Sequence, residues 1–132
     1  MNEDLSSTER SEYSISELAR EFDVTPRAIR FYEDHGLLAP KRAGQRRIYS
    51  ARDRTRLKLT LRGKRLGLTL SEIRELIDMS EPGRDERPQL ERFLAVLQEH
   101  TSSLLQQRAD IEAQLSELQA FEKKIKKQIR RN

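Results

Sequence analysis

The sequence predicts a mainly α-helical protein of 132 residues, in which a unit of short helices precedes one long C-terminal helix. Hydroxyl and carboxylate residues recur in the first 80 residues at the spacing that begins helices. From Pro88 to Arg130 the chain has neither glycine nor proline, and aliphatic residues recur every seventh position. Hydrophobic residues make up 35% of the chain and charged residues 36%, so the core must be built from aliphatic stripes on amphipathic helices.

Four helix starts are visible in the first unit. Ser14–Glu17, Ser50–Asp53 and Thr69–Glu72 each place a hydroxyl three residues before a carboxylate, which is the spacing of a capping box. Thr25 followed by Pro26 is a fourth start, because proline at the first helical position loses no N–H that the helix needs. With glycine stops at 36 and 67, these signals predict helices over 15–22, 26–34, 51–66 and 70–79.

The first two helices are separated by only about three residues, Phe-Asp-Val, and this short connection predicts a helix-turn-helix. A generic helical hairpin would show the same spacing. The apolar residues expected to pack between the two helices are Leu18, Phe22, Val24, Ile29 and Tyr32.

The segment between Gly36 and Ser50 predicts a small basic hairpin. Its proline and glycine disfavour a helix, and the sequence Arg-Arg-Ile-Tyr at 46–49 can pair with Leu-Leu-Ala-Pro at 37–40. The alternative is a disordered basic loop, but Ile48 and Tyr49 favour a strand. A hairpin here would form a wing beside the helix-turn-helix.

Positive charge is concentrated in the same part of the chain. Residues 25–65 contain 13 lysines and arginines and three acids, a net charge of +10, whereas the remaining residues carry 13 bases and 19 acids, a net charge of −6. A merely solvated surface normally mixes the two signs. This concentration favours a surface that binds a polyanion such as nucleic acid, because each neutralised phosphate releases counterions.

The helix expected at 26–34 is the predicted recognition helix. We expect Ile29 to anchor it on the domain while Thr25, Arg27 and Arg30 face the major groove of DNA. Arginine suits this position because its two parallel donors match guanine or phosphate. Tyr32 has two interpretations: its hydroxyl binds a phosphate, or the ring belongs to the core.

Further contacts are expected from the wing and from the helix starts. Wing residues 46–49 would grip the DNA backbone, whereas the arginines at 52, 54 and 56 are interpreted as the exposed face of the next helix. The junction before residue 69 offers two bases and free N–H groups, which would make a phosphate site and a second wing. These expected contacts are Ser14, Arg46, Arg47, Tyr49, Lys64, Arg65 and Thr69.

The C-terminal third predicts a coiled coil. The first heptad set is fully aliphatic and comprises Leu90, Leu97, Leu104, Ile111, Leu118 and Ile125; the second set comprises Leu94, Thr101, Arg108, Leu115, Glu122 and Ile129, of which three are aliphatic. A helix of about 42 residues would be roughly 63 Å long and cannot bury this seam alone. We therefore expect a homodimer, with dimerisation residues Leu90, Leu94, Leu97, Leu104, Ile111, Leu115, Leu118 and Ile125.

These observations divide the chain into four parts. We expect a disordered N-terminal arm over 1–12, a DNA-binding domain over 13–80, a linker over 81–87 and a dimerisation helix over 88–132.

Several functions are disfavoured by composition. The chain has no cysteine, which excludes disulfides, thiolate metal ligands and a cysteine nucleophile. His35 and His100 lie on different elements, so a metal site is not expected, and no cofactor is expected. No catalytic constellation is visible, and Asp53 and Glu72 are interpreted as capping carboxylates, so we do not expect an enzyme. Without a signal peptide or an apolar run of about 18 residues, the expected location is the cytoplasm, with no membrane partner.

Three ordered motifs, Tyr13–Leu38, the Arg-Ile-Tyr at 47–49 and the Leu-Gly-Leu-Thr-Leu-Ser-Glu-Ile segment at 66–73, resemble the N-terminal domain of the MerR family of bacterial transcriptional regulators. The segment 25–67 is also similar to the LiuR-type subgroup, which controls genes of branched-chain amino acid and fatty-acid catabolism.

The resemblance implies a winged helix-turn-helix dimer joined by an antiparallel coiled coil. It also implies binding to an inverted repeat in a promoter with an overlong spacer, whose distortion realigns the promoter for RNA polymerase. Many relatives carry an effector module or metal-binding cysteines after the long helix. Here a small-molecule effector would bind between the linker and the start of the long helix, or the protein responds to none.

Two alternatives stay open. An effector-independent repressor or architectural DNA binder would use the same residues. A coiled-coil interaction protein would explain the C-terminal third but not the basic block.

Overall fold

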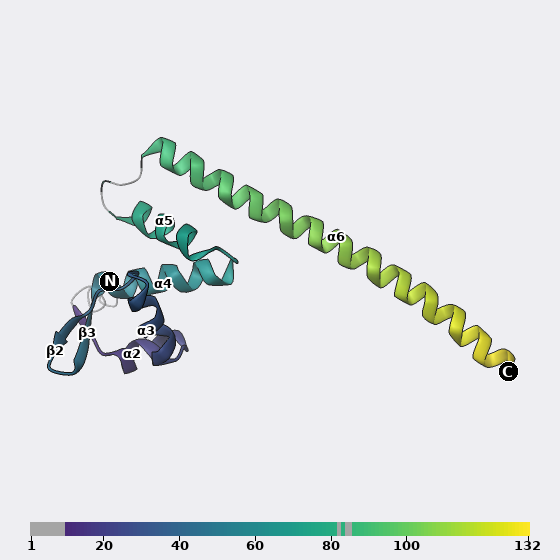
Figure 1. Cartoon of the computed structure of the whole chain (residues 1–132), viewed down its shortest axis with the longest axis horizontal. Helices are drawn as coiled ribbons and strands as arrows, with labels where there is room; N and C mark the ends of the chain where they lie inside the picture. The colour runs from purple at the N-terminus through teal and green to yellow at the C-terminus, as the bar shows by residue number, and fades with distance from the viewer. Residues whose placement is uncertain (1–9, 82, 84–85) are drawn as a thin grey trace, which may run out of the picture. The chain divides into compact units, whose positions relative to one another are not determined.

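The computed structural model describes residues 10–81, 83 and 86–132, and the chain divides into two units, Met1–Gln89 and Leu90–Asn132. The order of elements is β1 (Glu12–Tyr13), α2 (Ile15–Phe22), α3 (Pro26–Asp34), β2 (Lys41–Ala43), β3 (Arg46–Ser50), α4 (Ala51–Arg65), α5 (Leu70–Ser80) and α6 (Arg87–Arg131) (Figure 1). The protein is thus mainly helical, as predicted, with the long helix at its C-terminus.

The predicted helix starts are confirmed. Ser14, Ser50 and Thr69 each accept a hydrogen bond from the backbone N–H three residues later, and the carboxylate at that later position binds the backbone N–H of the capping residue. Thr25 caps α3 and accepts from the N–H of Ala28. Each helix of the first unit therefore begins where local chemistry places it.

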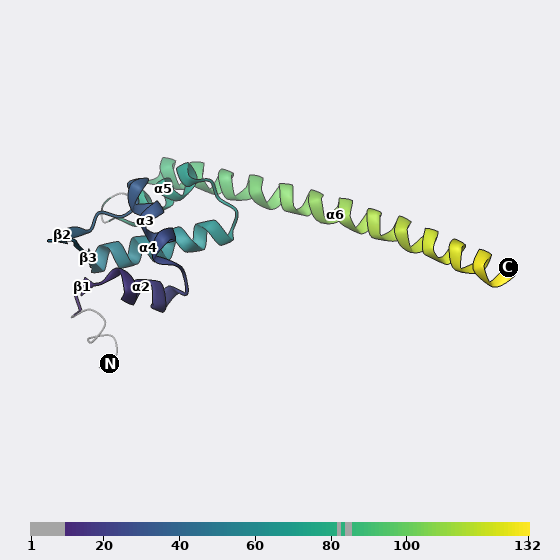
Figure 2. The same cartoon turned by 60° about the horizontal axis from the view of Figure 1, so that its bottom comes forward.

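The small sheet differs from the prediction in two ways. The hairpin is formed by β2 and β3, in which Arg42 pairs with Arg47, and 37–40 does not provide the first strand. The physical reason is that Leu37 and Leu38 are buried in the core and cannot lie on an exposed strand. In addition, β1 pairs with β3 on its other edge, giving the order β1-β3-β2 (Figure 2).

The pairing of β1 also corrects the expected N-terminal arm. Glu12 pairs with Ser50, so the ordered domain begins before residue 13. Residues 1–9 of the expected arm lie outside the described residues, as do residues 82, 84 and 85 of the expected linker.

The core of the first unit lies where α2, α3, α4, α5 and β3 present their apolar faces. Its fully buried side chains include Leu18, Ile29, Leu37, Tyr49, Leu57, Ile73 and Ile77. Gly63 allows α5 to approach α4 closely, because a Cβ at this position would lie 2.6 Å from Cγ1 of Ile73. Gly63 therefore serves as a packing contact between α4 and α5.

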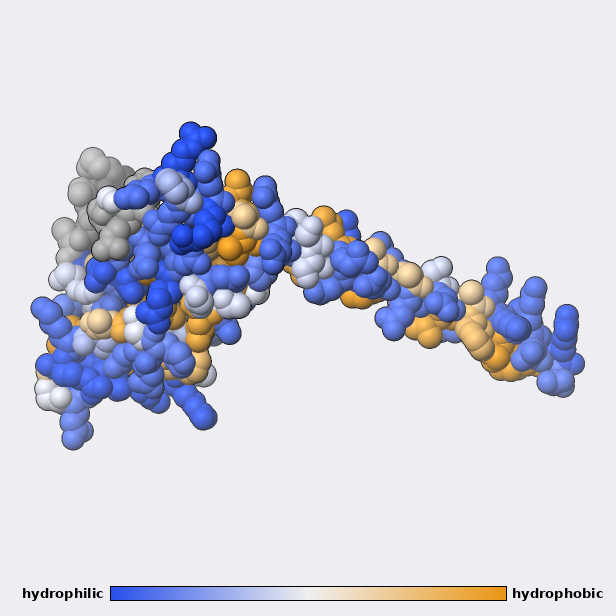
Figure 3. Space-filling model, turned by 45° about the horizontal axis from the view of Figure 1, so that its top comes forward, coloured by the Kyte–Doolittle hydropathy of each residue, from blue (hydrophilic) through white to orange (hydrophobic). Residues whose placement is uncertain are grey.

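The second unit is a single helical segment with most of its large apolar residues exposed. Side chains of both heptad sets are 42–68% exposed at Leu90, Leu94, Leu104, Ile111, Leu115, Leu118, Ile125 and Ile129. Figure 3 shows hydrophobic residues recurring along this helix among hydrophilic ones. A helix with such a stripe gains stability when another apolar surface covers it. None of the described helices is both long and apolar enough to span a membrane.

Candidate nucleic-acid interface

The recognition helix presents one buried face and one basic face. Ile29 is fully buried and Tyr32 is 7% exposed, so both side chains hold α3 on the domain. Burial raises the pKa of Tyr32, which agrees with the core interpretation of this residue. Arg27 and Arg30 are exposed and form no hydrogen bond or ion pair within the described residues. Their donors are therefore available to a ligand at the N-terminal half of the helix.

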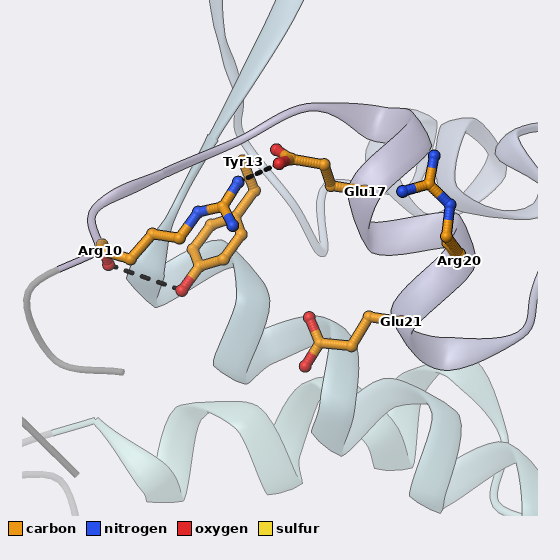
Figure 4. Close-up of a pocket in the computed structure, with 5 residues that line it drawn as sticks. All are labelled: Arg10, Tyr13, Glu17, Arg20 and Glu21. Atoms are coloured by element: carbon orange, nitrogen blue, oxygen red, sulfur yellow. Dashed lines mark hydrogen bonds and ion pairs between the residues drawn. The ribbon is translucent and has the colours of Figure 1, made fainter. Parts of the chain in front are cut away.

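The start of α2 carries a second group of polar residues. Ser14 is exposed, and its Oγ accepts from the N–H of Glu17 at 3.1 Å, which leaves the hydroxyl proton available for donation. Beside it, the guanidinium of Arg10 lies 4.6 Å from the ring centre of Tyr13 and pairs with Glu17 (Figure 4). The Ser14 N–H, and after it this pair with Arg10, hold the pKa of Glu17 below its ordinary value. Both contacts fix the chain that leads into α2.

The wing is fastened to the recognition helix by one carboxylate. Nε of Arg47 donates to Glu33 on α3 at 2.7 Å, and the Tyr49 hydroxyl lies 3.4 Å from the same oxygen. Tyr49 has no exposed surface, and burial followed by the Glu33 charge raises its pKa to about 12. The burial argues against the DNA contact expected for Tyr49 and assigns it to the core. Arg46, in contrast, is exposed, and its side chain donates no hydrogen bond to another described residue.

The turn between α4 and α5 carries the residues of the expected second basic site. Lys64 and Arg65 are exposed in the last turn of α4, and Gly67 has a φ of +82°, a conformation that favours glycine. Thr69 is exposed and caps α5, and the first amides of a helix have no partner within it. The capping box pairs the N–H groups of Thr69 and Glu72, so the two bases lie close in sequence to the remaining first amides of α5, at Leu70 and Ser71. Such an arrangement suits phosphate.

The structure separates the thirteen bases of residues 25–65 into two groups. Five are paired with carboxylates of the same unit: Arg42, Arg47, Arg52, Arg54 and Arg56. The other eight are exposed and form no ion pair within the described residues: Arg27, Arg30, Lys41, Arg46, Lys58, Arg62, Lys64 and Arg65. The unpaired group includes five of the residues expected to contact DNA.

The α4 arginines bind partners that the sequence pattern does not indicate. Arg52 and Arg56 both bind Glu81, and Arg54 binds Glu21 while lying 5.6 Å from the ring of Phe22. The Arg56 side chain is only 14% exposed. The interpretation as an exposed face therefore holds for Arg52, whose side chain is 65% exposed, but not for Arg54 and Arg56, whose side chains are 33% and 14% exposed. Because their partners lie 25 to 33 residues away, no local pattern could have indicated them.

The fold and the charge distribution define a DNA-binding protein of the winged helix-turn-helix class. Within the described residues, no group of three or more His, Asp or Glu side chains could hold a metal ion. The family model described as "MerR HTH family regulatory protein" matches residues 13–80, and the model described as "MerR, DNA binding" matches residues 54–126. The chain therefore belongs to the MerR family of DNA-binding transcriptional regulators.

Individual relatives agree with this assignment. The HTH-type transcriptional regulator ZntR of Escherichia coli K12 is 30% identical, and the match covers 87% of this chain and 77% of the relative. The crystal structure of a MerR-family transcriptional regulator from Bacillus cereus is similar, with a TM-score of 0.64, 31% identity and coverage of 80% and 75%. HiNmlR, a MerR family regulator lacking the sensor domain and bound to promoter DNA, shares the fold, with a TM-score of 0.56, 23% identity and coverage of 80% and 79%. These relatives are transcriptional regulators and not enzymes, which supports a non-enzymatic role indirectly.

Proposed function

We propose that the chain binds an inverted repeat inside a promoter with an overlong spacer, as a homodimer, and that it distorts the DNA so that RNA polymerase can use the promoter. The observation that carries this proposal is a set of eight exposed bases on the recognition helix, the wing, α4 and the second turn, none of which is paired with another described residue. A protein with several such bases binds any duplex through phosphates, and the arginines of the recognition helix add sequence preference.

Within this proposal the residues have distinct roles. Arg27 and Arg30 read base edges from the N-terminal half of α3, where the capping residue Thr25 also faces the groove. Ser14, Arg46, Lys64, Arg65 and Thr69 contact the phosphates on either side. Arg47 and Tyr49 support the wing from behind, because both are bound to Glu33.

The dimer is proposed to form through α6. When two copies of α6 run antiparallel, one register places every position of the first heptad set opposite a position of the partner's second set. In it, Leu94 faces the partner's Ile125, and Arg108 faces the partner's Ile111. Each polar member of the second set then faces an aliphatic residue. A parallel pairing would instead place Arg108 against the partner's Arg108. It would also place the two C-terminal segments 123–131, each with six bases, side by side, so that like charges repel.

Cysteine cross-linking tests this arrangement, since the chain has no cysteine of its own. A mixture of Leu94→Cys and Ile125→Cys proteins should form a disulfide-linked dimer under mild oxidation, and neither variant should do so alone. Efficient cross-linking of the single variants would indicate a parallel pair. A protein that stays monomeric at every concentration would contradict the dimer itself.

Binding selection tests the DNA-binding proposal. Genomic fragments bound by the purified protein would be sequenced, and the affinity for the enriched site would be measured at two salt concentrations. We expect an inverted repeat within long-spacer promoters and an affinity that falls steeply as salt rises. Failure to enrich any sequence would overturn the proposal and favour a coiled-coil interaction protein.

The regulated genes and the effector are proposed on resemblance alone. Similarity to the LiuR-type subgroup points to genes of branched-chain amino acid or fatty-acid catabolism, and the protein would act in the cytoplasm. Transcription from the enriched promoters, with and without intermediates of these pathways, separates an effector-controlled regulator from an effector-independent repressor.

A further inference from the structure

Glu33 is the only acidic side chain of the recognition helix that contacts the wing within the described residues. It belongs to the last turn of α3, and its side chain is 17% exposed. It accepts hydrogen bonds from Arg47 Nε at 2.7 Å and from the Tyr49 hydroxyl at 3.4 Å, both on β3. It also lies 3.6 Å from the guanidinium of Arg42 on β2. One carboxylate of α3 therefore binds both strands of the hairpin.

The two ion pairs differ in strength. Arg47 is 22% exposed, so its bond to Glu33 is shielded from water, and this bond raises the pKa of the guanidinium. Arg42 is 52% exposed and its contact is longer, so solvent and salt screen it more strongly. Arg47 is thus firmly held, and Arg42 is held loosely.

These pairs have a consequence for DNA binding. An arginine that is free to move can bind a phosphate of any sequence, and each such contact raises affinity for random and specific DNA alike. An arginine bound to a carboxylate of its own protein gains less from a phosphate, because the first bond must break. Pairing within the protein therefore lowers non-specific affinity more than it lowers affinity for a site that the recognition helix fits.

We propose that Glu33 is a specificity-determining positioning residue: it withholds Arg47 and Arg42 from DNA phosphates and fixes the wing relative to the recognition helix. The inference rests on the proposed DNA-binding function and extends it. Specificity then depends on an acidic residue that touches no DNA, as well as on the arginines that do.

Asp34 provides a matched control on the same helix. It is the next residue, it is exposed, and it forms no hydrogen bond or ion pair within the described residues. Glu33→Gln and Asp34→Asn each remove one negative charge from the same turn of α3. Only the first releases the wing arginines, so general charge effects cancel in the comparison.

The experiment measures the dissociation constants of the full-length protein and both variants for the enriched operator and for a random duplex, over a series of salt concentrations. We expect Glu33→Gln to tighten binding to random DNA and to steepen the plot of log affinity against log salt by about 1 to 2, since each additional phosphate contact contributes about 0.9. The ratio of specific to random affinity should fall. Asp34→Asn should change the affinity for the operator and for random DNA by the same factor and leave the salt slope unchanged.

Two further variants test the mechanism. Adding Arg47→Gln to Glu33→Gln should remove most of the gain in slope, whereas Arg47→Gln alone should leave the slope of the wild-type protein unchanged. Circular dichroism and the melting temperature show whether each variant is folded, and Arg47→Gln alone tests the proposal even if Glu33→Gln does not fold. Equal slopes and equal specificity ratios for Glu33→Gln and Asp34→Asn would overturn the inference. A wild-type protein that shows no operator preference would instead overturn the proposed function.

Discussion

Nη1 of Arg56 donates a hydrogen bond to Oε1 of Glu81 over 2.9 Å and thereby joins the middle of α4 to the end of α5. The same guanidinium donates through Nε to the carbonyl oxygen of Leu37 at 2.7 Å, in the segment that follows the recognition helix. Arg52 adds two bonds to Glu81, at 3.0 and 2.7 Å. Two arginines and one carboxylate thus hold together three segments that are distant in sequence.

This cluster predicts a pH-dependent contribution to stability. Bonds from Arg52 and then Arg56 hold the pKa of Glu81 below its ordinary value of 4.5. A carboxylate with a lowered folded-state pKa stabilises the fold above the unfolded value and loses that contribution as pH falls through the folded value. We expect Glu81→Gln to lower the urea midpoint at pH 7, with a difference from wild type that shrinks below about pH 4.5. A difference that stays constant down to pH 3 would contradict this explanation.

Gly63 predicts a cost of overpacking. Replacement by alanine places a methyl group against Ile73, and such overpacking costs about 1–3 kcal/mol, whereas alanine improves helix propensity by about 1 kcal/mol. We expect a net loss of free energy of unfolding in urea titrations. Combining Gly63→Ala with Ile73→Ala should cost less than the sum of the two single changes, since the second substitution makes room for the first. If the two losses of free energy simply add, the cost of Gly63→Ala does not come from its contact with Ile73.

The recognition helix predicts a division between base readers and phosphate contacts. Arg27→Ala or Arg30→Ala should relax the preference at one operator position, at a cost of about 1–3 kcal/mol there. Lys64→Ala should weaken binding to all duplexes alike and reduce the salt slope by about 1. Affinity measured on a panel of single-base operator variants distinguishes these effects. Uniform losses for all three variants would show that neither arginine reads a base.

The exposed seam of α6 predicts the effect of a buried charge on dimerisation. Ile111→Asp places a carboxylate in the proposed interface, which costs several kcal/mol and should give a monomer in analytical ultracentrifugation. Ala113→Asp adds the same charge on the opposite side of the helix and should leave the dimer intact. If both variants associate as the wild type does, another surface must hold the dimer. The monomer should also bind the operator poorly, because two half-sites require two linked domains.

The sequence by itself determined the helices, the recognition helix and the basic block. Capping boxes and proline act within a few residues, so Ser14, Thr25, Ser50 and Thr69 begin their helices wherever the domain folds. A heptad repeat is likewise local in origin, and the bounds of α6, Arg87–Arg131, differ by one residue at each end from the expected 88–132.

Only the tertiary structure decided which arginines are available and which are held. Neither the pairing of Glu33 with Arg47 nor that of Glu81 with Arg56 follows from spacing, because each joins residues that meet only after the helices and the hairpin pack. The same holds for β1, whose two residues pair with β3. Local patterns fix which segments are helical, whereas long-range packing fixes the partners of side chains that could bind either a carboxylate or a phosphate.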